Sequence, residues 1–230
     1  MIKSYGLLTI IFLFSSTLGF TTQLSANQSS ETQTLNEASE ISSKRILVLG
    51  DSLSAAYGIP IEQAWVALLG KTLEKQFSDI DNTYKIINAS ISGETTDGGL
   101  RSLPALLRKY HPEVVIIELG ANDGLRGFPL KTIERNLEKL IVLAQMNNAK
   151  VLLTGIHTPP NYGNRYASAF HQIYSKLAKQ YNTQLLPFLL EGIATNPKLM
   201  QADGLHPKAS AQATIKSLIW EQLEPMLTSD

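Results

Sequence analysis

Short apolar runs alternate with longer segments of helical periodicity along most of this chain, and this alternation restricts the fold more than any other feature. The runs rich in Val and Ile predict five strands, at residues 45–49, 84–89, 113–119, 150–156 and 184–189. In the third run, residues 114–117 read Val-Val-Ile-Ile, so both faces of that strand must be covered by other elements. Between the runs, segments such as residues 130–141 carry apolar side chains at helical spacing. The pattern predicts a three-layer α/β/α sandwich around a five-stranded parallel sheet.

The length and the N-terminal composition predict how the chain is divided. With 230 residues, of which 43% are hydrophobic, it can bury one sizeable core, which we expect at residues 44–230. Residues 1–26 have the pattern of a secretory signal peptide, with Lys3 before an apolar stretch and Ala26 at a candidate cleavage point. An uncleaved membrane anchor is the alternative, but the apolar stretch is shorter than the roughly 20 residues that span a bilayer. Residues 27–43 are rich in Ser, Thr, Gln, Asn and Glu, which predicts a flexible leader and, with the signal peptide, a periplasmic or secreted protein.

Charge and composition argue against several classes of partner. Twenty basic residues balance twenty acidic ones, so no net charge would attract nucleic acid or an anionic membrane. Cys is absent, which excludes thiolate nucleophiles and cysteine-ligated metals. No phosphate-binding Gly-rich loop, dinucleotide fingerprint or His-Glu-x-x-His motif occurs, so we expect no cofactor and no metal. The expected partner is a small-molecule substrate, bound by a monomer that makes no stable insertion into a membrane.

Polar residues follow several of the predicted strands. Ser52 lies at the end of the first strand, in the segment Gly50-Asp51-Ser52, and ligands of open α/β sheets bind at the carboxyl ends of the strands. Helix capping is the simpler interpretation of such a serine, because Asp and Ser are common capping residues. Three other segments therefore matter, and they are Ser90-Ile91-Ser92-Gly93-Glu94, Gly120-Ala121-Asn122-Asp123 and Asp203-Gly204-Leu205-His206-Pro207.

Together these segments supply the groups that acyl transfer needs. A serine hydroxyl becomes a nucleophile when a base such as His206 takes its proton, and Asp203 is close enough in sequence to orient that imidazole. The oxyanion of the tetrahedral intermediate needs donors in place, which the N–H groups of Ser52 and Gly93 and the Asn122 amide could supply. The alternative is that Asp203 and Gly204 form only a turn and His206 is a solvated loop residue.

The same four segments resemble, in residue type and order, the sequence blocks of the SGNH or GDSL hydrolases. Residues 160–163, which read Pro-Asn-Tyr-Gly, together with Tyr166 are similar to a further segment of the family's periplasmic thioesterases, lysophospholipases and arylesterases. The resemblance spans residues 44–230 and implies a flavodoxin-like α/β/α fold, with the catalytic residues Ser52, Asp203 and His206 and the oxyanion hole Ser52, Gly93 and Asn122. Ala121 departs from the family, where many members carry Gly, and the added methyl group could change the fit of the substrate.

The substrate class follows from the resemblance and from the apolar residues near the site. The resemblance implies hydrolysis of acyl esters and thioesters, such as lysophospholipids, acyl-CoA and aryl esters. We expect Leu125, Phe128, Tyr162 and His157 to contact the substrate. Two alternatives are a carbohydrate O-deacetylase of the same family and a non-catalytic lipid or glycan binder.

Two acidic residues near Ser52 need a separate explanation. Asp51 is interpreted as a local hydrogen-bonding residue, because consecutive side chains point in different directions. Glu118 lies in an otherwise apolar strand, where an unpaired charge would be costly. We therefore expect Glu118 to have a hydrogen-bond partner near the site or a raised pKa.

Overall fold

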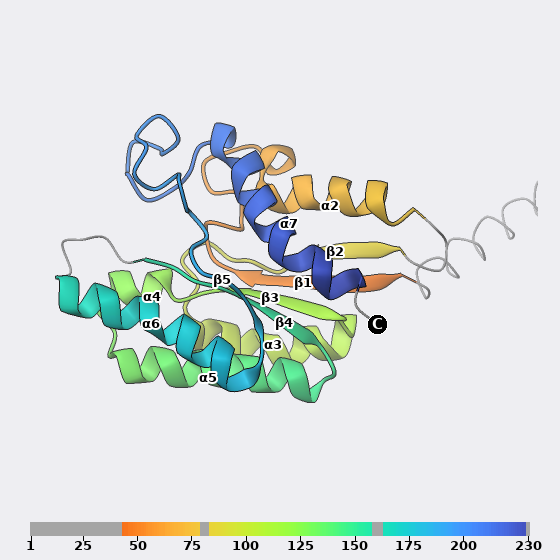
Figure 1. The fold of residues 1–230 in the computed structure, drawn as a ribbon, viewed down its shortest axis with the longest axis horizontal. Coiled ribbons are helices and arrows are strands. Elements are labelled where there is room, and N and C mark those ends of the chain that lie inside the picture. The colour runs from red at the N-terminus through yellow and green to blue at the C-terminus, as the bar shows by residue number, and fades with distance from the viewer. Residues whose placement is uncertain (1–42, 79–82, 158–162, 229–230) are drawn as a thin grey trace, which may run out of the picture. The chain divides into compact units, whose positions relative to one another are not determined.

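A five-stranded parallel sheet forms the centre of the computed structural model, which describes residues 43–78, 83–157 and 163–228 (Figure 1). The order of the strands across the sheet is β2-β1-β3-β4-β5, and the fold class predicted from the sequence is confirmed. The chain leaves β1 in one direction to form β2 and returns on the other side of β1 to form β3. The carboxyl ends of β1 and β3 therefore lie at a topological switch point, where α/β sheets bind their ligands. The bounds are β1 (Lys44–Gly50), β2 (Tyr84–Asn88), β3 (Val114–Glu118), β4 (Lys150–Thr154) and β5 (Gln184–Leu186).

Helices cover both faces of the sheet. On one face lie α2 (Trp65–Gln76) and α7 (Gln212–Thr228), and on the other lie α3 (Thr96–Tyr110), α5 (Leu130–Met146) and α6 (Asn164–Tyr181) (Figure 1). Three shorter helical segments are η1 (Ile61–Gln63), α4 (Ala121–Leu125) and η4 (Ala209–Ala211). In the described part of the chain, no helix has both the length and the apolar character needed to cross a membrane.

The continuous apolar runs are explained by two separate cores, one on each face of the sheet. In β3, Val114 and Ile116 belong to the core under α2 and α7, whereas Val115 and Ile117 belong to the core under α3, α5 and α6. All four side chains are completely buried. Each such side chain stabilises the fold by about 1.5–3 kcal/mol relative to exposure. The loops at the carboxyl ends of the strands are therefore anchored on a sheet that is packed tightly on both faces.

The fifth predicted strand is the one whose end differs most from the structure. β5 ends at Leu186, and Pro187 follows, which has no N–H to continue the ladder. The next residues still follow β4 irregularly, because Leu189 N–H donates to Gly155 O at 3.0 Å. The predicted signal peptide, the leader up to residue 42 and Tyr162 lie outside the described residues.

Candidate active site

The turn that carries Ser52 is built around the buried carboxyl group of Glu118. Glu118 Oε2 accepts hydrogen bonds from the Asp51 N–H at 3.2 Å and from the Ser54 hydroxyl at 2.7 Å. This oxygen comes so close to the end of β1 that a Cβ atom on Gly50 would lie 2.8 Å from it. Gly50 is therefore required for the close approach, and Glu118 holds the turn on both sides of Ser52.

Ser52, His206 and Asp203 form a continuous chain of hydrogen bonds. The Ser52 Oγ atom lies 2.9 Å from His206 Nε2, although the two residues are 154 positions apart in sequence. On the other side of the ring, His206 Nδ1 lies 2.7 Å from Asp203 Oδ2. Since a carboxylate can only accept, Nδ1 carries the proton and Nε2 is free to accept the proton of Ser52.

The loop before α7 holds Asp203 in its ionised form. The other carboxylate oxygen, Oδ1, accepts the N–H groups of Leu205 at 2.9 Å and of His206 at 3.0 Å. The hydrogen bond to the His206 side chain, followed by those to the two N–H groups, lowers the pKa of Asp203 to about 2. Asp203 is therefore ionised throughout the neutral range and stabilises a positive charge on His206.

Tyr57 lies against the His206 ring, and the sequence analysis did not identify it. The ring centroids are 4.3 Å apart with an angle of 36° between the planes. Tyr57 is tied to the catalytic loops, since its N–H donates to Ser52 O at 3.4 Å and its carbonyl accepts from Gln201 Nε2 at 2.9 Å. Its ring covers one side of the imidazole. An exposed aromatic residue five positions after Ser52 carries no sequence pattern that would predict this contact.

Three hydrogen-bond donors at this end of the sheet remain available, and two of them belong to Ser52 and Asn122, which line the cavity described below. Within the described residues, the N–H groups of Ser52 and Gly93 have no acceptor. Gly93 has a φ of 82°, a left-handed conformation that suits glycine. The Asn122 amide donates one hydrogen to Asp51 Oδ2 at 3.0 Å, which leaves the second hydrogen free. The loop of Gly93 is held at this end of the sheet, because Ile91 N–H donates to Gly50 O at 3.0 Å.

Asp51 and Glu118 form a buried pair of carboxyl groups behind the site, and both are completely buried. Burial raises the pKa of Asp51 to about 6, although hydrogen bonds from Leu53 N–H and Asn122 oppose the change. Burial, followed by the charge of Asp51, raises the pKa of Glu118 well above its usual value. Glu118 Oε1 has no partner among the described residues and is the oxygen free to carry the proton. Burial therefore favours the protonated form of Glu118, whereas a pKa of about 6 leaves Asp51 mostly ionised at pH 7.

An apolar cavity of about 690 Å³ opens beside Ser52 and His206. Of the residues expected to contact a substrate, Leu125 and His157 line it. Phe128 is not among the lining residues, because it packs against the core under α3, α5 and α6, where its carbonyl accepts the Tyr166 hydroxyl at 3.0 Å. Ala121, whose methyl group was expected to affect the fit of the substrate, also lines the cavity. The walls further include residues that the sequence analysis did not identify, namely Ile156, Ala167, Phe188, Leu189, Leu190 and Met200.

His157 belongs to the wall of the cavity and not to the chain of hydrogen bonds at Ser52. Its ring lies 4.2 Å from the Phe188 ring and 3.9 Å from the His171 ring, measured between centroids. Burial, followed by the neighbouring His171, lowers the pKa of His157. His157 is therefore neutral near pH 7. Within the described ranges, no cluster of three His, Asp or Glu side chains could hold a metal ion.

Curated relatives match the sequence of this chain over most of their own length. An arylesterase of Vibrio mimicus is 50% identical over 189 residues, which cover 82% of this chain and 92% of that protein. Esterase TesA of Pseudomonas aeruginosa is 46% identical, with 82% of this chain and 92% of that protein covered. The thioesterase 1/protease 1/lysophospholipase L1 of Escherichia coli is 44% identical, with 80% and 86% covered.

Solved structures agree with the fold. The crystal structure of TesA matches with a TM-score of 0.76 at 48% identity and covers 80% of this chain and 99% of that chain. The esterase EstA from Pseudoalteromonas, in a structure inhibited by monoethylphosphonate, matches with a TM-score of 0.75 at 45% identity and covers 81% and 100%. Residues 48–213 match the family model described as GDSL-like Lipase/Acylhydrolase. These matches confirm the resemblance seen in the sequence, and this chain belongs to the GDSL-like lipase and acylhydrolase family.

Proposed function

We propose that this chain hydrolyses carboxylic esters and thioesters of fatty acyl groups through an acyl-enzyme intermediate on Ser52. The observation that carries the proposal is the chain of hydrogen bonds from Asp203 through His206 to Ser52, at 2.7 and 2.9 Å, beside an apolar cavity. Lysophospholipids, acyl-CoA and aryl esters are the proposed substrates. The names of the relatives, which include an arylesterase and a thioesterase and lysophospholipase, support this range.

In the first half of the reaction, Ser52 Oγ attacks the acyl carbonyl carbon while His206 Nε2 accepts the hydroxyl proton. The negative charge that develops on the carbonyl oxygen is stabilised by the N–H groups of Ser52 and Gly93 and by the free Asn122 N–H. The bond to the leaving group then breaks, and His206 returns the proton to the departing oxygen or sulfur. Ionised Asp203 stabilises the transient imidazolium.

In the second half, a water molecule replaces the leaving group. His206 accepts a proton from this water as its oxygen attacks the acyl-Ser52 carbonyl, and the same donors hold the second oxyanion. When this intermediate breaks down, Ser52 Oγ regains the proton from His206 and the free acid leaves. No cofactor or metal takes part.

Substrate choice is set by the cavity and by the leaving group. Each methylene that the cavity buries contributes about 0.8 kcal/mol, so medium and long acyl chains are preferred over acetate. A thiolate leaves more easily than an alkoxide, because the pKa of its conjugate acid is near ~8.5. The signal peptide pattern of residues 1–26 supports a periplasmic or secreted location for the reaction.

The test uses p-nitrophenyl esters of graded chain length and acyl-CoA, with Ser52→Ala as the control. We expect hydrolysis of medium and long chains, loss of that activity in Ser52→Ala, and labelling of Ser52 by a fluorophosphonate, located by peptide mass spectrometry. Hydrolysis of acetate esters alone would instead support a carbohydrate deacetylase, and no hydrolysis would support a binding protein. Parent-level activity in Ser52→Ala would overturn the mechanism.

A further inference from the structure

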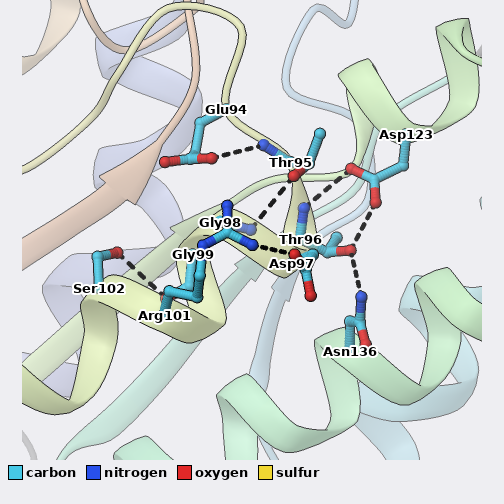
Figure 2. Close-up of polar contacts among 10 residues, drawn as sticks. All are labelled: Glu94, Thr95, Thr96, Asp97, Gly98, Gly99, Arg101, Ser102, Asp123 and Asn136. Carbon is cyan, nitrogen blue, oxygen red and sulfur yellow. Dashed lines mark hydrogen bonds and ion pairs between the residues drawn. The ribbon is translucent and has the colours of Figure 1, made fainter.

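A buried polar cluster joins the loop of Gly93 to the helix of Asn122. It consists of Thr96, Asp123 and Asn136, whose exposed fractions are 0%, 0% and 5%. Figure 2 shows Thr96 between Asp123 on one side and Asn136 on the other. None of the three lines the substrate cavity. The cluster therefore has no direct contact with a substrate, and its polar groups need another explanation.

Asp123 uses both carboxylate oxygens to hold a single residue. Its Oδ1 accepts the Thr96 hydroxyl hydrogen at 2.6 Å, and its Oδ2 accepts the Thr96 N–H at 2.9 Å. The same hydroxyl oxygen accepts a hydrogen bond from Asn136 Nδ2 at 3.1 Å, which comes from α5 (Figure 2). Two simultaneous bonds fix both the distance and the orientation between α4 and the start of α3.

Asp123 and Thr96 are each close in sequence to one of the two oxyanion donors that do not belong to Ser52. Asp123 directly follows Asn122, and Thr96 comes three residues after Gly93. The short segment between Gly93 and Thr96 is itself fixed, because Glu94 Oε1 accepts Thr95 N–H at 3.0 Å and Thr95 Oγ1 accepts Gly98 N–H at 3.2 Å (Figure 2). A second link runs from Arg126 Nη2 to Gly93 O at 3.1 Å.

We propose that Asp123 is a positioning residue, which sets the separation of the Gly93 N–H and the Asn122 amide through its paired bonds to Thr96. The inference rests on the oxyanion role of these donors in the proposed function. Such donors act only when they lie about 2.7–3.1 Å from the oxyanion, and displacement by about 0.5 Å is enough to weaken them. Gly93 lies on a loop and Asn122 in α4, and the backbone of the sheet alone does not set their separation.

Thr96→Val tests this with a change of nearly constant shape. It removes the hydroxyl from the bond to Asp123 but keeps the Thr96 N–H bond. We expect kcat for a p-nitrophenyl ester to fall about 10- to 100-fold, less than the loss of a whole donor, with KM within about threefold. Thr96→Ser keeps the hydroxyl and should restore kcat. Asp123→Asn, which turns one acceptor into a donor, should lower kcat at least as much as Thr96→Val.

A matched control separates positioning from stability. Thr154 is also completely buried, and its hydroxyl donates to Ile117 O at 3.2 Å, a bond that joins β4 to β3 and involves neither the loop of Gly93 nor α4. Thr154→Val should therefore lower the melting temperature by an amount similar to Thr96→Val but leave kcat within about twofold. The two variants should also be combined with Asn122→Ala. If Thr96 acts through the oxyanion hole, Thr96→Val should reduce kcat much less in that background than in the parent.

Three results would overturn the inference. They are an unchanged kcat in folded Thr96→Val, an equal loss of kcat in Thr154→Val, and full additivity of Thr96→Val with Asn122→Ala. Failure of the proposed function is recognised separately, because Ser52→Ala or Asn122→Ala would then retain parent activity. If Asp123→Asn does not fold, the comparison of Thr96→Val with Thr96→Ser decides the question alone.

Discussion

Replacement of Asp51 by Asn should remove a pH dependence of stability that the buried carboxyl pair creates. Asp51 has an ordinary pKa of 3.8 in the unfolded chain and of about 6 in the folded protein, chiefly because of burial. At about 1.36 kcal/mol for each pH unit, this difference corresponds to about 3 kcal/mol of unfolding free energy. The contribution is favourable at low pH, because the folded state holds the proton more tightly than the unfolded state does.

The direction of the effect follows from the raised pKa. Below about pH 3 Asp51 is mostly protonated in both states, and ionisation removes little stability. As the pH rises from about 3 to 7, the unfolded chain ionises first, so the parent protein loses up to about 3 kcal/mol. The Asp51→Asn variant has no carboxyl group at this position, so its stability should lose none of this contribution as the pH rises. The loss of an acceptor for Asn122 should lower its stability by an amount that does not change with pH.

Urea unfolding at pH values between 4 and 8 measures the difference. Trp65 is completely buried, so its fluorescence reports unfolding. The free energy of unfolding of the parent minus that of the variant should fall by about 2.5 kcal/mol between pH 4 and pH 7 and then level off, since a small part of the effect is already lost at pH 4. The comparison should be repeated in a Glu118→Gln background, because the glutamine carbonyl still accepts the bonds from Asp51 N–H and Ser54 but cannot titrate. A flat difference curve in both backgrounds would refute the assignment of a raised pKa to Asp51.

Three further predictions concern activity. Asn122→Ala should lower kcat for p-nitrophenyl esters about 100- to 1,000-fold with an unchanged circular dichroism spectrum, and a loss below about fivefold would contradict its role as an oxyanion donor. Asp203→Asn should lower kcat about 10⁴-fold, because the histidine tautomer that leaves Nε2 free is no longer favoured, and near-parent turnover would show that Asp203 does not orient His206. Ala167→Phe narrows the cavity and should reduce kcat/KM about fourfold for each acyl methylene that it excludes, measured from butyrate to dodecanoate esters, whereas an unchanged chain-length profile would place the acyl chain elsewhere.

The position of the candidate site could be predicted, whereas its supporting contacts could not. Ser52 lies two residues after the end of β1, and parallel strands direct their carboxyl ends to one edge, so the strand-end residues had to gather there. The expected anomaly at Glu118 was also visible, since a carboxyl group in an apolar strand needs a partner or a proton. That the partners would be Ser54 and the Asp51 N–H depends on how the turn folds back over β3.

The lining of the cavity shows the limit of sequence reasoning. Phe128 was expected there as an apolar residue near Asn122, but the turn after α4 directs it into the core under α3, α5 and α6. Leu189 and Leu190 take part instead, because the chain leaves β5 at Leu186 and continues irregularly beside β4. Sequence patterns predict strands and helices from apolar residues that recur every two or 3.6 positions. Neither of these two placements depends on such a period, so neither could be predicted in this way.

By itself, the sequence determined the layers of the fold and the strand ends that carry the polar residues, and it placed Asp203 close enough to His206 for a contact. These depend on local periodicity and on short spacings, which the chain encodes within a few residues. Only the tertiary structure decided that the Tyr57 ring packs against His206, that Asp51 accepts a hydrogen bond from Asn122, and that Asp123 accepts one from the Thr96 hydroxyl. Such contacts join loops far apart in sequence, and the packing of the helices on the sheet decides which side chains meet.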